Sequence, residues 1–237
     1  MHSVVPDTPD LLRAAAALTG LPARSVTFTA VSEVAAAPWR RAFGDQMQVL
    51  VLPNGIDPGE WAAPHLDSAD ADLVVVSVGR VASRKRLLAL VPMFANLRDE
   101  LPRTRIRAIL IGDGPQLPKL RQEVSRWGLR DVVDLPGKLT RSQIKHILHR
   151  ADVYLAPATL ESFGIAALEA RCAGVPVVAM ARGGAGEFID DGREGFLVSG
   201  DTEMVKTVLT LARTRLCAGA SVGTTPRRAR PWRGLRC

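Results

Sequence analysis

The chain has 237 residues, of which 47% are hydrophobic and 23% are charged, so it is long and apolar enough for one large or two small packed domains. No apolar run reaches the roughly 18 residues that span a bilayer, no basic segment precedes the first apolar stretch, and the three cysteines are too widely spaced for a disulfide framework or a zinc site. We therefore expect a cytoplasmic protein in which Cys172 is a small core residue.

The net charge of +7 is concentrated at the C-terminus. Residues 206–237 hold eight Lys or Arg and no acid, which leaves 23 bases (31 less 8) against 24 acids in the rest. This neutral body argues against a specific nucleic-acid partner. Residues 217–237 show no helical or strand period and are predicted to form a basic disordered tail. Two alternatives stay open for this tail. It contacts nucleic acid or an anionic membrane, or it is an out-of-frame translation of a GC-rich gene.

The first 55 residues hold few elements. We predict a helix over 10–18, short strands over 25–32 and 48–53, and a helix over 33–43 between them. The stretch PNGIDPGEWAAPHLDSAD is rich in turn-forming Pro, Gly and Asn and has no period, which indicates an interdomain linker over residues 56–71.

From residue 72 to residue 216 the pattern becomes regular. Short apolar runs alternate with amphipathic segments, which predicts an α/β domain with a doubly wound, Rossmann-like parallel sheet covered on both faces. The predicted strands are 73–79, 106–112, 132–137, 152–157, 175–180 and 195–200. The predicted helices are 87–99, 116–127, 140–149, 164–173, 185–190 and 202–215. Ligands of such sheets bind at the carboxyl ends of the strands.

The first strand of this domain ends in VGRVASRKRL. Gly79 permits a tight turn, and Arg80 and Lys85 place two cations before a helix expected from Leu87. Cations at a helix N-terminus suit a diphosphate, because the helix dipole and the exposed N–H groups favour anions as well. The alternative is a solvated basic loop.

The next two strands end in glycine turns. LIGDGPQ contains Gly112, and LPGKLT contains Gly137 and Lys138, whose backbone polar groups are expected to be free to meet a flat base. Neither turn is a P-loop or a dinucleotide fingerprint, which argues against a triphosphatase and a nicotinamide-binding half.

The fourth strand runs into LESFGIAALEARCAG, where Glu161 and Glu169 are eight residues apart. On a helix this separation is about 12 Å of rise, so the two carboxylates cannot form a close acid and base pair. If Glu161 and Ser162 precede the helix, the N–H groups from Phe163 to Ile165 can face phosphate oxygens and Glu169 can accept from a diol such as ribose. The alternative is a capping acid and a solvent-facing glutamate.

Taken together, these motifs resemble the retaining glycosyltransferases of the GT-B fold, family 4. The segments that carry the resemblance are VLPNGID, VGRVASRK, IGDGP, ADVYLAPATLESFGIAALEARCAGVPVVA and GGAGEFIDDGREGFLV. The family's pair of glutamates separated by seven residues matches Glu161 and Glu169, and the resemblance covers about residues 25–212.

The resemblance implies transfer of a hexose from a UDP- or GDP-sugar to a lipid or saccharide acceptor, with retention of configuration by front-face attack. Arg80 and Lys85 would stabilise the leaving diphosphate, and Glu161 would act with them as the third catalytic residue, at the sugar. The donor would further contact Gly79, Gly112, Gly137, Lys138, Glu169 and the segment Ser162, Phe163, Gly164 and Ile165. No metal or cofactor is expected, and peripheral attachment at the inner face of the membrane stays open.

The chain departs from the family at both ends. Residues 1–55 are too few for the N-terminal acceptor domain and are predicted to be its last part, while the C-terminus lacks the usual returning helix. Two hypotheses therefore stand: a glycosyltransferase represented by its donor-binding half, and a non-catalytic sugar-nucleotide-binding fragment or inactive remnant.

Overall fold

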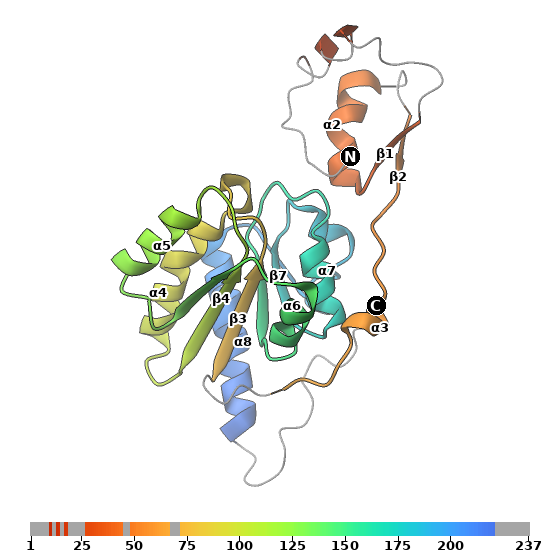
Figure 1. Cartoon of the computed structure of the whole chain (residues 1–237). Coiled ribbons are helices and arrows are strands. Elements are labelled where there is room, and N and C mark those ends of the chain that lie inside the picture. The colour runs from red at the N-terminus through yellow and green to blue at the C-terminus, as the bar shows by residue number, and fades with distance from the viewer. Residues whose placement is uncertain are drawn as a thin grey trace.

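The computed structural model describes residues 10, 13, 14, 17, 18, 27–44, 48–66 and 72–220 (Figure 1). The first two residues of the strand predicted over 25–32, part of the helix predicted over 10–18, the last five linker residues and most of the predicted tail lie outside the described residues. No helix among those described is both long enough and apolar enough to cross a bilayer.

The main body is a six-stranded sheet in the order β5-β4-β3-β6-β7-β8, and every pair of neighbouring strands is parallel. Its strands are β3 (Leu73–Val78), β4 (Ile106–Ile111), β5 (Val133–Gly137), β6 (Val153–Ala156), β7 (Val177–Met180) and β8 (Phe196–Val198). The order reverses between β3 and β6, as in a doubly wound sheet. The predicted strands and fold class are confirmed, with strand ends moved by up to two residues.

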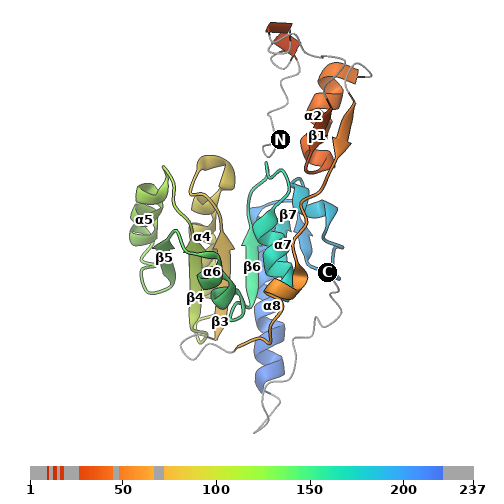
Figure 2. The ribbon, with the colours of Figure 1, turned by 45° about the vertical axis from the view of Figure 1, so that its right-hand side comes forward.

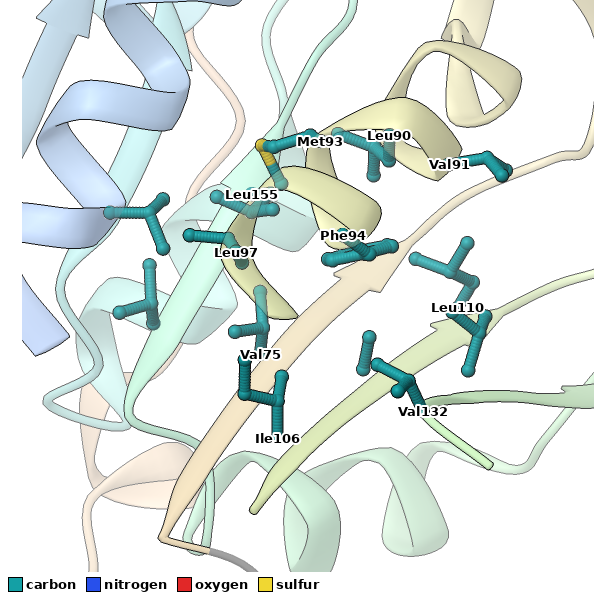
Figure 3. Close-up of a cluster of buried hydrophobic side chains, with 14 of the residues drawn as sticks. Val75, Leu90, Val91, Met93, Phe94, Leu97, Ile106, Leu110, Val132 and Leu155 are labelled. Carbon is teal, nitrogen blue, oxygen red and sulfur yellow. The ribbon is translucent and has the colours of Figure 1, made fainter. Parts of the chain in front are cut away.

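Helices cover both faces of this sheet (Figures 1 and 2). On one face lie α4 (Leu90–Glu100), α5 (Leu117–Arg126) and α8 (Asp201–Ala220), and on the other lie α6 (Arg141–Leu148) and α7 (Ile165–Cys172). Val75, Leu110 and Leu155 from three strands meet Phe94 and Leu97 of α4 in a buried cluster (Figure 3). Burial of both faces explains why the strands are apolar at almost every position.

Three predicted segments differ in detail. The helix expected from Leu87 begins at Leu90, after two 3-10 turns at Ser83–Lys85 and Leu87–Ala89 that are separated by Arg86 in the left-handed region (φ 54°). The helix expected over 185–190 is a 3-10 turn, Gly184–Glu187. The segment predicted to be a linker contains a short helix, α3 (Pro58–Trp61), because Asp57 caps it and Trp61 is buried.

The end of α8 corrects the predicted tail. The helix continues to Ala220, so residues 217–220 are helical and only 221–237 of the tail lie outside the described residues. The turns just before are tied to the body, because Arg213 binds Glu100 at 3.0 Å and Arg215 binds Asp152 at 2.7 Å.

The N-terminal part holds β1 (Phe28–Ala30) paired in parallel with β2 (Val49–Val51), and α2 (Glu33–Phe43) between them. An extended segment leads from β2 down to α3 beside α7 (Figure 2). Buried residues of this part, including Ala35 and Phe43, belong to the same apolar cluster as Phe163 and Ala185 of the main body. The N-terminal part therefore contacts the loops at the carboxyl edge of the sheet.

Candidate functional site

The predicted glycines meet at the carboxyl edge of the sheet. Gly79 follows β3 and donates its N–H to Ile111 at 2.9 Å, and Gly112 follows β4 and donates its N–H to the Gly137 carbonyl at 2.8 Å. The prediction that the backbone of Gly137 is free is therefore wrong for its carbonyl, while Lys138 beside it is exposed. These hydrogen bonds fix three strand-end turns side by side.

Lys85 and Glu161 form an ion pair across this edge. The side chains come from the loop after β3 and the loop after β6, and they are only 28% and 20% exposed, so the pair is partly shielded from water. Arg80, five residues before Lys85, is exposed at the same turn. Because α4 starts at Leu90, Lys85 lies in a 3-10 turn rather than directly before a helix, and the expected helix dipole is not at this lysine.

The loop from Glu161 to Gly164 is held by the glycine-rich turn after β7. Gly184 donates its N–H to the Glu161 carbonyl at 2.8 Å, and a Cβ on Gly184 would lie 2.3 Å from the Ser162 oxygen. Ser162 and Phe163 are buried, and the ring of Phe163 packs 5.3 Å from that of Phe188. Only a residue without a side chain therefore fits at position 184, where the two loops pack backbone against backbone.

The helix α7 begins just after this loop. Its N-cap is Gly164 (φ 91°), and no side chain caps its first turn in the described residues. The N–H of Ala167 already donates to the Gly164 carbonyl at 2.9 Å, so the N–H groups of Ile165 and Ala166 are the ones available to an anion. Ile165 at the first position is 40% exposed. Glu161 and Ser162 thus lie in the loop and Glu169 lies one turn into the helix, as predicted, and the helix start is suited to an anion.

Glu169 is largely buried, with 18% of its side chain exposed. Burial raises the pKa of this carboxyl, and the Arg141 guanidinium, 3.9 Å away, lowers it in opposition. Beneath the loop, the Tyr154 hydroxyl donates to the Val78 carbonyl at 3.2 Å, and burial raises the pKa of this phenol. Tyr154 therefore remains protonated and holds the end of β3 beside β6.

Sequence reasoning missed three of the side chains that organise this edge. Arg86, which is assigned no role from the sequence, donates to the Pro157 carbonyl at 2.9 Å and to Asp201 at 2.7 Å. Tyr154 occupies a strand position that is read as core, and Arg141 lies on a helix distant in sequence from Glu169. The one available signal was Tyr154, the single tyrosine, among the apolar residues of its strand.

Parallel strands with glycine turns, paired charges and an uncapped helix at one edge define a Rossmann-like domain of the GT-B type. The chain belongs to the glycosyl transferases group 1, whose family model matches residues 63–213. Within the described residues, no group of three or more His, Cys, Asp or Glu side chains is placed to hold a metal ion.

Relatives and solved structures agree with this assignment. The chain is 27% identical to the putative colanic acid biosynthesis glycosyltransferase WcaL of Escherichia coli over 64% of its length and 38% of the relative's. It is 34% identical to the D-inositol 3-phosphate glycosyltransferase of Actinosynnema mirum, over 66% of its length and 41% of the relative's. The chain thus spans about two fifths of these curated relatives.

Among solved structures, HepE of Anabaena, crystallised with UDP-glucose, superposes with a TM-score of 0.70 at 25% identity, covering 91% of this chain and 61% of that one. The C-terminal domain of LpcC, a glycosyl transferase group 1 family protein from Francisella tularensis, matches with a TM-score of 0.59 at 20% identity and is itself covered to 91%. The second match shows the fold alone.

Proposed function

We propose that this chain binds a nucleoside-diphosphate sugar and transfers its hexose, with retention of configuration, to a saccharide or lipid acceptor. The observation that supports this most is the arrangement around the loop from Glu161 to Gly164. A cation from β3, a carboxylate from β6 and the uncapped start of α7 lie together, and Glu169 follows one turn further. The matched Anabaena structure, solved with UDP-glucose, supports a UDP-sugar as the first donor to test.

The proposed reaction breaks the bond between the anomeric carbon and the diphosphate and forms a bond to an acceptor hydroxyl. The diphosphate leaves with the electron pair, and the hydroxyl proton is transferred to it. Lys85, Arg80 and the start of α7 would stabilise the negative charge that develops on the leaving group. Glu169 would accept from the ribose hydroxyls, and Gly112, Gly137 and Lys138 would lie near the base.

The ion pair between Lys85 and Glu161 suggests how the donor is engaged. A diphosphate competes for the Lys85 ammonium, because the diphosphate carries two negative charges whereas a carboxylate carries one. Once Lys85 turns to the phosphates, Glu161 is released to accept hydrogen bonds from the sugar hydroxyls. The two cations supply the positive charge, so the proposal includes no metal and no cofactor. Membrane contact and a cytoplasmic location remain part of the same proposal.

A second function is favoured by one observation: the chain spans about two fifths of its curated relatives. Residues 1–55 are proposed to be the last part of an acceptor domain. In that case this chain is a fragment that binds the donor without transferring its sugar. Binding without turnover supports this second function, whereas binding with transfer to an added saccharide acceptor supports the first.

The test is calorimetric titration of the full chain with UDP-glucose and GDP-mannose, followed by a transfer assay. Lys85→Met is expected to weaken donor binding about 10- to 100-fold, because it removes one charge-assisted bond to phosphate. Arg126→Met is the control, since Arg126 is 77% exposed and is the last residue of α5, a helix whose first residue follows the turn at the carboxyl edge. Equal affinity of Lys85→Met and the wild type, or no binding by the wild type, would contradict the proposed site.

A further inference from the structure

Arg141 has three partners, from two other elements. Its guanidinium lies 2.9 Å from Glu60 and 5.0 Å from the centre of the Trp61 ring, both on α3, and 3.9 Å from Glu169 on α7. Arg141 itself is the first residue of α6. One side chain therefore links the short helix that follows the N-terminal part to the carboxylate at the nucleotide end of the proposed donor site.

This position is not explained by the stability of α6. A cation at the first residue of a helix opposes the helix dipole, and the pair with Glu60 joins side chains that are 58% and 54% exposed, which contributes little. The helix start is instead stabilised by a capping box between Thr140 and Gln143. The stability of α6 therefore does not explain why an arginine occupies position 141.

The α3 side of the contact is firmly held. Trp61 is 1% exposed, and its carbonyl accepts from the His149 ring at 3.0 Å. The Asp57 side chain caps the helix through Gly59 N–H at 2.9 Å, and α3 packs on α7. A fixed aromatic face gives the guanidinium a defined place, since cations are attracted to the face of an indole.

We propose that Arg141, seated on Trp61 and Glu60 of α3, is a positioning residue that keeps the Glu169 carboxylate ionised and aimed for a diol ligand. This inference rests on the proposed function, in which Glu169 receives the ribose. It makes α3 part of the donor site, although α3 lies within the segment that joins the N-terminal part to the sheet.

The groups around Glu169 determine the direction in which its pKa changes when Arg141 is removed. Burial favours the neutral carboxyl, Arg141 of α6 favours the carboxylate, Glu60 of α3 partly offsets the arginine, and Tyr154 of β6 stays neutral. Only the ionised form accepts from both ribose hydroxyls. Removing Arg141 therefore raises the pKa of Glu169, and donor binding is lost at a higher pH as the solution is acidified.

The experiment titrates the full chain with UDP from about pH 5 to about pH 8. Arg141→Gln is expected to weaken binding about tenfold at the acid end and to move the pH of half-maximal binding upward, because each unit of pKa is a factor of ten in the ionised fraction. Arg141→Lys should restore part of the acid-side affinity. Arg126→Gln is the control, since Arg126 is 77% exposed on α5 and pairs only weakly with Glu123, at 3.8 Å.

Two outcomes separate this inference from the proposed function. A wild type that binds neither UDP nor GDP contradicts the proposed function, and a Glu169 carboxyl followed by carbon-13 NMR then still reports whether Arg141→Gln raises its pKa. A wild type that binds UDP, with an Arg141→Gln profile weakened equally at every pH, or a Glu169 pKa unchanged by the substitution, overturns the inference alone. Thermal unfolding of each variant identifies losses due to misfolding, and Arg141→Lys then serves as the second variant.

Discussion

At the scale of single residues, the site depends on backbones that approach too closely for side chains. A Cβ on Gly112 would lie 1.9 Å from the Gly79 oxygen, and one on Gly114 would lie 2.5 Å from the Val81 oxygen. Both glycines also have positive φ values, of 143° and 156°. The turns after β3 and β4 are therefore packed backbone against backbone, which holds Gly79 and the following Arg80 in place.

Gly112→Ala is expected to lower the free energy of unfolding by about 3 kcal/mol and to weaken donor binding, because the methyl group must displace the Gly79 peptide. Chemical denaturation and calorimetry measure the two effects. Gly128→Ala is the matched control, since it has a positive φ of 62° but open space around its Cβ, and it should cost only about 1–2 kcal/mol without affecting binding. Equal costs for the two variants would mean that backbone conformation, not the close approach, dominates.

At the scale of elements, one carboxylate links several segments at the edge of the sheet opposite the candidate site. Asp152 precedes β6, has a side chain that is 4% exposed, and accepts from the Val74 N–H at 2.8 Å and from Arg215 of α8 at 2.7 Å. The His65 ring lies 3.6 Å from its other oxygen. A strand, the last helix and the segment after α3 therefore converge on one buried side chain.

Asp152→Ala is expected to destabilise the protein by about 3–5 kcal/mol, because it removes the acceptor of a buried strand N–H and the carboxylate that pairs with a partly buried guanidinium. Asp152→Asn should cost less, since its amide oxygen still accepts from Val74. Urea unfolding followed by circular dichroism gives both values. A loss below about 1 kcal/mol for the alanine variant would show that water replaces the carboxylate at this edge.

The sequence predicts the layers of this fold better than the contacts of its site. Apolar runs that alternate with amphipathic segments predict the sheet and its helices, because strands that are buried on both faces are apolar at nearly every position. Glycine and charge after each strand mark the ligand edge, and the placement of Glu161 and Glu169 follows from the start of one helix. The partners of Arg141, Arg86 and Asp152 are not readable, because they come from segments up to 115 residues away that meet only through tertiary packing. The left-handed backbone conformation of Arg86 is also not predictable, because such a conformation is usually signalled by a glycine.

At the scale of the whole molecule, the N-terminal part is joined to the donor-site loops by polar contacts as well as by the apolar cluster. Glu187, in the turn after β7, accepts from the N–H groups of Glu33 and Val34, each at 2.9 Å, and so caps α2. The Ser32 hydroxyl donates to the Ser162 carbonyl. The turn that fixes the Glu161 loop through Gly184 is therefore the same turn that receives α2.

Glu187→Ala is expected to loosen this junction without unfolding the sheet. The first N–H groups of α2 lose a carboxylate that satisfies two of them and favours the positive end of the helix dipole. Amide exchange of Glu33 and Val34 should become about fivefold faster, the ratio that corresponds to about 1 kcal/mol, while Val75 and Leu110 in the central strands should keep their protection. Hydrogen exchange read by NMR measures each amide. Glu203→Ala is the matched control, because Glu203 also accepts from a backbone N–H, that of Ser199 at 2.7 Å, but does so at the start of α8. If Glu33 and Val34 exchange at wild-type rates in Glu187→Ala, the apolar cluster and the bond from Ser32 to Ser162 hold the N-terminal part on the donor-site loops without Glu187.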